Sequence, residues 1–195
     1  MSTTQVIPPP LARHLPGDRD VWIFIFAELL MFGAFFVAYL VHRQTSVDLY
    51  NASQQTLDRD LGVINTIFLI TSSWLAVSAV ASARANRSRE IVSRLAGAIT
   101  LALAFIVVKY FEYTTKFAEG INLTTNDFYM FYFALTMIHL AHVMAGTVIL
   151  SVLLLNAKEE KYHRQNLSGL EAGTAYWHLV DLLWIFLFPL LYLLR

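Results

Sequence analysis

The last apolar stretch of the chain, YWHLVDLLWIFLFPLLYLLR, contains two ionisable residues, His178 and Asp181. Their spacing of three residues places both side chains on one face of a helix, where a carboxylate can orient an imidazole. No metal-binding partner stands near them in the sequence. We therefore expect an internal polar lock, in which Asp181 bonds to His178 and to the indole N–H groups of Trp177 and Trp184.

Two further histidines, His139 and His142, lie in the apolar segment FYMFYFALTMIHLAHVMAGTVIL. A haem held by two histidines needs imidazoles from facing helices, and a pair three residues apart supplies only part of a metal site. His178 lies nearer a membrane boundary than the other two, so their depths match poorly. The main prediction is a chain that binds no haem or metal itself. A b-type cytochrome using His139 or His142 with His178 is the alternative.

Glu28 is an acidic residue about 10 Å inside the first apolar segment by helical rise. A carboxylate at this depth costs about 2.5 to 3.5 kcal/mol on insertion scales, so it should face protein, water or a lipid head group. Two interpretations stay open: a neutral acid bonded to a neighbouring helix, or a proton-linked or lipid-linked group. Asp181 lies at a similar depth, which allows the two acids to be neighbours.

Lys109, Glu112 and Lys116 follow one another at steps of three and four residues, so the glutamate can pair with either lysine on one helical face. An internal ion pair is the main interpretation, and a polar contact to another subunit or a proton-accessible cavity is the second. A small transporter with a path lined by Glu28, Lys109 and Asp181 is a further alternative. The absence of internal repeats argues against it.

The elements that position these residues are predicted to be membrane-spanning helices. Hydrophobic residues make up 57% of the 195 residues and charged residues 14%, well on the apolar side of soluble domains. Five segments approach or exceed the roughly 20 residues that a helix needs to cross a bilayer, and backbone groups in lipid must bond internally. These segments are residues 21–41, 62–83, 95–116, 128–155 and 174–194. We predict an all-α integral membrane bundle of five transmembrane helices over residues 21–195, after a flexible arm at residues 1–20.

Composition and charge exclude several classes of function. The formal net charge is zero, which gives no basic surface for nucleic acid. The chain has no cysteine, so thiolate metal sites, iron–sulfur clusters and covalently attached haem are excluded. Ser72, Ala76, Ala79 and Ala83 recur at steps of three and four, which predicts close helix packing.

Lysine and arginine flank the predicted spans unevenly, with nine on one side and four on the other. Basic residues favour the cytoplasmic side, so the N-terminus is predicted to be cytoplasmic and the C-terminus to lie on the opposite side of the membrane. The polar loop HRQTSVDLYNASQQTLDRD on the outer side is expected to connect spans or to contact a partner. The larger group is Arg13, Arg19, Arg84, Arg87, Arg89, Arg94, Lys158, Lys161 and Arg164, and the smaller is Arg43, Arg59, Lys116 and Arg195.

Taken in order, five motifs resemble subunit III of the haem-copper oxidase superfamily. They are FAELLMFGAFFVAYL, INTIFLITSS, KYFEY, FYFALTMIHLAHVMAGT and GLEAGTAYWHLVDLLWIFLF, and they cover nearly all of the chain after the arm. The chain lacks the first two helices of the seven-helix form. Its short length, its HLPGDRDVWIFIFAELLMFG lead-in and its brief outer loops look more like the five-helix accessory proteins of bacterial nitric oxide reductases, often called the NorE type.

The resemblance implies a subunit that is not catalytic alone, binds no cofactor and packs against a catalytic subunit that holds the haem and the iron or copper. That partner would be nitric oxide reductase in denitrification or, as the alternative, a terminal cytochrome c or quinol oxidase. In the family, the acid matching Glu28 is a buried, carbodiimide-reactive group on the proton-uptake side. Membrane lipids are further expected partners, although the family's lipid-holding cleft uses the two helices absent here.

Overall fold

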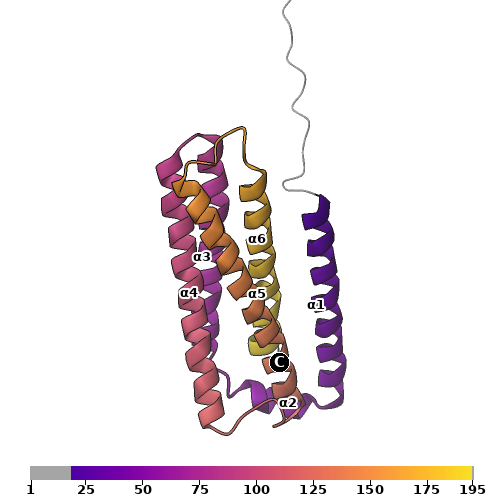
Figure 1. Cartoon of the computed structure of the whole chain (residues 1–195). Helices are drawn as coiled ribbons and strands as arrows, with labels where there is room; N and C mark the ends of the chain where they lie inside the picture. Colours follow the sequence, from indigo (N-terminus) through magenta and orange to yellow (C-terminus); the bar gives the residue numbers. More distant parts are fainter. Residues whose placement is uncertain (1–18, 195) are drawn as a thin grey trace, which may run out of the picture.

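The computed structural model describes residues 19–194, and these residues form a long helical bundle (Figure 1). Five of its helices are long and apolar enough to cross a membrane, in agreement with the predicted number of spans. The predicted flexible arm at residues 1–20 lies outside the described residues except for its last two, which begin the first helix. The helices are α1 Arg19–Thr45, α2 Val47–Gln54, α3 Arg59–Arg84, α4 Ser88–Ala118, α5 Asp127–Lys158 and α6 Ser168–Phe188.

The helices begin where the sequence supplies polar caps. The Asp58 side chain accepts hydrogen bonds from the backbone N–H groups of Asp60 and Leu61 at the start of α3, and Asn126 does the same for Tyr129 in α5. These bonds satisfy N–H groups that the first turn of a helix leaves free. Both caps lie at the same end of the bundle, where the chain turns back into the apolar region.

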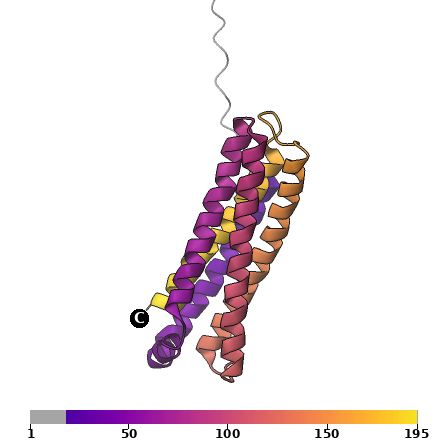
Figure 2. The same ribbon diagram turned by 90° about the vertical axis from the view of Figure 1, so that its left-hand side faces the viewer.

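Helices α3 and α4 pack side by side along their length, as Figure 2 shows. The predicted small-residue seam is confirmed, because Ser72, Ala76, Ala79 and Ala83 are all buried. The Ser72 hydroxyl donates a hydrogen bond of 2.8 Å to the carbonyl of Ala98 on α4. Without a hydrophobic driving force in lipid, such close approach and polar contact are what hold helices together.

The polar loop HRQTSVDLYNASQQTLDRD contains a helix that was not among the predicted elements. Its middle forms the short helix α2, which lies across one end of the bundle (Figure 1). Tyr50 of α2 is buried against Tyr39 and Phe128, at ring-centroid distances of 5.4 and 5.7 Å. The Gln54 amide donates a hydrogen bond of 3.0 Å to the carbonyl of Leu191. A segment expected to connect spans or contact a partner therefore packs on the chain's own core.

The last span also departs from a simple helix. After α6, residues Pro189–Leu193 form a π-helical turn, in which the N–H of Leu194 donates to the carbonyl of Pro189 at 2.9 Å. Proline has no N–H and its ring clashes with the carbonyl four residues earlier, so the regular ladder stops there. The wider turn places Tyr192 in the core, where it is fully buried.

The start of α1, the α3–α4 turn and the α5–α6 link lie at one end of the bundle, and α2 and Leu194 lie at the other (Figures 1 and 2). Helix α1 packs on α5 and α6, and α4 lies on the far side of the bundle (Figure 1). This arrangement separates the two groups of basic residues within the described part of the chain.

Candidate functional site

A buried ion pair between Lys109 and Glu112 lies in the core, with Nζ and Oε2 3.0 Å apart and the two side chains 1% and 3% exposed. Glu112 also accepts a 2.5 Å hydrogen bond from the Tyr132 hydroxyl and a short one from the Tyr192 hydroxyl. Lys109 donates a 2.8 Å hydrogen bond to the Tyr192 oxygen. The predicted internal pair is confirmed, whereas Lys116 pairs with Glu119 at 2.7 Å.

Aromatic rings enclose the ammonium group and a neighbouring histidine. Lys109 Nζ lies 4.9 Å from the ring centroid of Trp184, which stabilises the cation through the ring quadrupole. His139 lies between Trp184 and Phe105, at centroid distances of 5.3 and 5.8 Å. Neither of its ring nitrogens has a hydrogen-bond partner within the described residues. His139 is therefore a core residue packed between rings, and a haem there would have to displace Trp184 or Phe105.

Glu28 and His142 form a second polar contact, which joins α1 to α5. His142 Nε2 lies 3.2 Å from Glu28 Oε2, and each side chain is partly exposed. The distance is that of an ion pair, although the angles do not meet those of a hydrogen bond. His142 Nδ1 lies 2.8 Å from the carbonyl of Ile138. Because a carbonyl only accepts, Nδ1 carries a proton, and Nε2 is the ring nitrogen that faces the Glu28 carboxyl group.

The polar lock predicted around Asp181 is wrong in its partners. The Trp177 indole donates to Ser72 at 3.1 Å and the Trp184 indole donates to Thr66 at 3.0 Å, so neither indole bonds to Asp181. Each indole instead ties α6 to α3. The sequence allowed both pairings, because it shows the spacing along α6 but not the helix that faces it.

Asp181 and His178 are bridged by a serine of α3. A hydrogen bond of 2.6 Å joins Ser73 Oγ and His178 Nδ1, whereas His178 Nδ1 and Asp181 Oδ2 are 4.0 Å apart. Ser73 also lies against the Asp181 carboxyl group. Asp181 is buried, but the His178 side chain is 64% exposed, so the pair is not internal as predicted.

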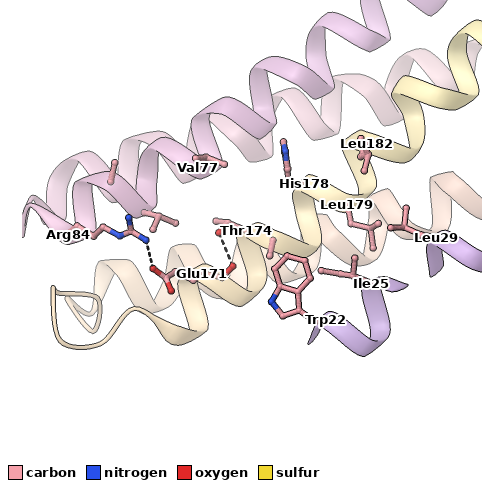
Figure 3. A pocket seen from close by; sticks show the side chains of 13 residues that line it. Trp22, Ile25, Leu29, Val77, Arg84, Glu171, Thr174, His178, Leu179 and Leu182 are labelled. Carbon is pink, nitrogen blue, oxygen red and sulfur yellow. Dashed lines mark hydrogen bonds and ion pairs between the residues drawn. The ribbon is translucent and has the colours of Figure 1, made fainter. Parts of the chain in front are cut away.

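Beside His178 lies a groove of about 500 Å³ between α1, α3 and α6 (Figure 3). Its walls are mostly aliphatic, and its mouth carries Arg84, which donates a 2.7 Å hydrogen bond to Glu171. Three of its lining residues, Trp22, Ile25 and Leu29, come from α1 (Figure 3). No sequence pattern predicts this groove, because its walls come from three segments far apart in the chain.

The seven ionisable residues singled out from the sequence therefore fall into three separate groups. Lys109 and Glu112 are paired near His139, Glu28 meets His142, and His178 approaches Asp181. Glu28 contacts His142 and Asp181 lies by Ser73, so the two acids, whose similar depth allowed them to be neighbours, have different partners. No described contact links Glu28, Lys109 and Asp181 into one path.

Sequence reasoning missed Tyr192 and Ser73 as partners in these groups. Tyr132 lies seven residues before His139 and so on the same face of α5, but the sequence does not relate it to Glu112 on α4. Spacing along one helix does not reveal which hydroxyl group bonds to a residue on another helix. Within the described residues, no group of three or more His, Cys, Asp or Glu side chains converges to hold a metal ion.

Five apolar spans with internally paired ionisable groups define a multi-pass helical membrane protein. A family model for cytochrome c oxidase subunit III matches residues 18–194, and the chain belongs to this family. Subunit III of haem-copper oxidases is not itself a metal-binding subunit, and members of the family associate with the catalytic subunit I.

Three relatives show the range of the similarity. The chain is 34% identical to cytochrome c oxidase subunit 3 of a Synechocystis species, over all of this chain and 88% of the relative. It is 26% identical to a probable quinol oxidase subunit 3 of Staphylococcus saprophyticus, over 89% of this chain and 86% of the relative. It is 30% identical to a haem-copper oxidase subunit I+III of Aeropyrum pernix, over 95% of this chain but only 24% of that longer protein.

Proposed function

We propose that this chain is a non-catalytic membrane subunit that packs against the catalytic subunit of a respiratory haem-copper complex and supports its assembly, stability or activity. The observation that carries the proposal is the family match, which runs from the start of α1 to the end of the π-helical turn. The geometry supports it, because the buried groups Lys109 and Glu112 neutralise each other and are bonded to Tyr132 and Tyr192, which ties α4 to α5 and to the end of the last span.

Two partner classes are supported by different observations. The HLPGDRDVWIFIFAELLMFG lead-in favours the catalytic subunit of nitric oxide reductase, with a role in denitrification. The printed names of the three relatives favour a terminal cytochrome c or quinol oxidase. In both cases the haem and the iron or copper belong to the partner.

The test is purification of an affinity-tagged chain from its native membrane, followed by mass spectrometry of the large subunit that accompanies it. Deletion of the chain should lower nitric oxide reduction in the first case and oxygen consumption in the second, and the gene supplied in trans should restore either activity. Absence of any haem-copper subunit from the purified material, together with unchanged activities after deletion, would refute the proposal.

An optical spectrum of the chain purified alone tests the b-type cytochrome alternative. We expect no haem absorption. A stoichiometric band that disappears in a His142→Ala or His178→Ala variant would instead identify the chain as a haem protein.

The proposed orientation places the start of α1 in the cytoplasm and Leu194 in the periplasm. Because the chain has no native cysteine, single substitutions report on it directly. A membrane-impermeant maleimide should label Asn122→Cys in the α4–α5 loop of intact spheroplasts, but Asn86→Cys in the α3–α4 turn only after lysis. The reverse pattern would invert the orientation.

A further inference from the structure

Two exposed polar side chains lie at one level near the middle of the spans, on the neighbouring helices α3 and α6, where a bilayer offers them nothing to bond. Trp74 on α3 is 66% exposed and His178 on α6 is 64% exposed. Ser73, the residue before Trp74, is bonded to His178 at 2.6 Å, which fixes the two residues at one level of the bundle.

Their depth follows from the spans themselves. The midpoint of the span Arg59–Arg84 falls between residues 71 and 72, and that of the span Ser168–Leu193 falls between residues 180 and 181. Trp74 and His178 are therefore each about 4 Å from the middle of their helices at 1.5 Å per residue, so the expectation that His178 lies near a membrane boundary is wrong. Tryptophan usually lies at the membrane–water interface rather than at this depth.

Each of these side chains has a polar atom without a partner. Ser73 bonds to Nδ1 of His178, so Nε2 is left over, and no contact within residues 21–194 involves Nε2 or the indole N–H of Trp74. Acyl chains cannot supply a hydrogen bond, and a polar group without one is costly in hydrocarbon. If this face contacted only lipid, His178 Nε2 and the Trp74 indole N–H would have no hydrogen-bond partner.

The other outer faces of the bundle are different. Around the middle of the remaining spans the exposed side chains are apolar, apart from Thr100, whose hydroxyl donates to the carbonyl of Ala96 in its own helix at 3.0 Å. These faces suit lipid without further contacts. Within the described spans, unpartnered polar atoms at mid-depth on exposed side chains are confined to the α3/α6 face.

The α3/α6 face is also hollowed. Val77, one turn from Trp74, and Leu182, one turn from His178, both line the groove shown in Figure 3. An apolar side chain of another helix can enter this groove while its polar neighbours bond to the exposed atoms. Large aromatic side chains beside a concave apolar site are typical of residues that dominate binding energy.

We propose that the α3/α6 face, centred on Trp74 and His178, is the surface on which a transmembrane helix of the catalytic subunit docks. That helix presents a hydrogen-bond acceptor to the Trp74 indole, a polar side chain to His178 Nε2 and an apolar side chain to the groove. The inference rests on the proposed function and adds the location and chemistry of the contact. A lipid is the competing occupant, and the experiments below separate the two.

The first experiment compares photo-crosslinking from two valines that are equally exposed. Val77 on α3 and Val107 on α4 are each 51% exposed and lie near the middle of their spans. With p-benzoyl-phenylalanine in place of Val77, irradiation of native membranes should crosslink the tagged chain to the large catalytic subunit. The same residue in place of Val107 should crosslink only to lipid.

The second experiment replaces the exposed polar groups with leucine. Trp74→Leu and His178→Leu should each lower the fraction of chain that remains bound to the catalytic subunit in detergent at least about tenfold. Tyr110→Leu on α4 removes a ring that is 63% exposed and should change this fraction less than about twofold. Equal amounts of each variant in the membrane would show that folding is retained, since leucine is well suited to lipid.

Three results would overturn the inference. They are crosslinking to the catalytic subunit from position 107 but not from position 77, crosslinking to lipid alone from position 77, and undiminished complex formation by both leucine variants. In each of these cases a complex that still co-purifies leaves the proposed function intact. If no haem-copper subunit co-purifies at all, the proposed function and this inference fail together.

Discussion

Removal of one partner of the Lys109–Glu112 pair should destabilise the bundle far more than removal of both. In Lys109→Met the Glu112 carboxylate stays buried and keeps only the hydroxyls of Tyr132 and Tyr192 as donors. In Glu112→Gln the ammonium group keeps the Tyr192 oxygen and the face of the Trp184 ring. Each single variant leaves a charge in the core that its remaining neighbours do not neutralise.

The expected size of the effect follows from the burial of both groups. Breaking a buried pair costs about 3 to 5 kcal/mol, because the remaining charge is uncompensated, whereas replacing both partners is often nearly neutral. The side chains of Lys109 and Glu112 are 1% and 3% exposed, so this range applies to each single variant. The sum of the two single losses should exceed the loss in the double variant by at least about 3 kcal/mol.

The assay is reversible unfolding in mixed micelles with increasing dodecyl sulfate, followed by tryptophan fluorescence, in a double-mutant cycle. The Lys116–Glu119 pair is a matched control, because it has the same spacing at the end of α4, where Glu119 directly follows Ala118 and its side chain is 47% exposed. Exposed pairs contribute about 0.2 to 1 kcal/mol, so its coupling should stay below about 1 kcal/mol. A similarly small coupling between Lys109 and Glu112 would refute the view that the pair is charged and mutually dependent in the core.

Two further predictions test other contacts. A Cβ at Gly146 would lie 2.6 Å from the Trp177 ring, so Gly146→Ala should cost about 1 to 3 kcal/mol in the same unfolding assay, whereas Gly33→Ala, with nothing within 4 Å, should be neutral or slightly stabilising. A hydrophobic carbodiimide should label Glu28, which is partly exposed beside His142, but not Glu112, which is enclosed by its partners. Mass spectrometry that finds labelling unchanged in Glu28→Gln would show that another acid reacts.

Several features of the fold followed directly from the sequence. The apolar segments located the five spans, because a run of about 20 apolar residues can satisfy its own backbone hydrogen bonds in a bilayer as a helix. The steps of three and four between small residues identified the packed face of α3 correctly. The same spacing predicted the Lys109–Glu112 pair, because both residues lie on one helix and their geometry is fixed by helical periodicity.

Contacts between helices were predicted less well. The indoles of Trp177 and Trp184 bond to α3 instead of Asp181, and Glu28 meets His142. Each of these partners is more than a hundred residues away in the chain, so no local periodicity relates them. Pro189 interrupts the regular hydrogen bonding of the last span. The π-helical turn that brings Tyr192 to Glu112 also depends on the packing around that turn, which the sequence does not show.

The sequence by itself determined that the chain is a five-span membrane bundle, and its motifs identified the family, because both depend on residue type and order along single helices. Only the tertiary structure decided which faces are inward. His178 looked like half of an internal lock, yet the packing of α3 on α6 leaves it exposed beside Trp74 with one nitrogen free. Exposure is a property of neighbouring helices and not of a residue's own spacing, which is why the docking face was visible only in three dimensions.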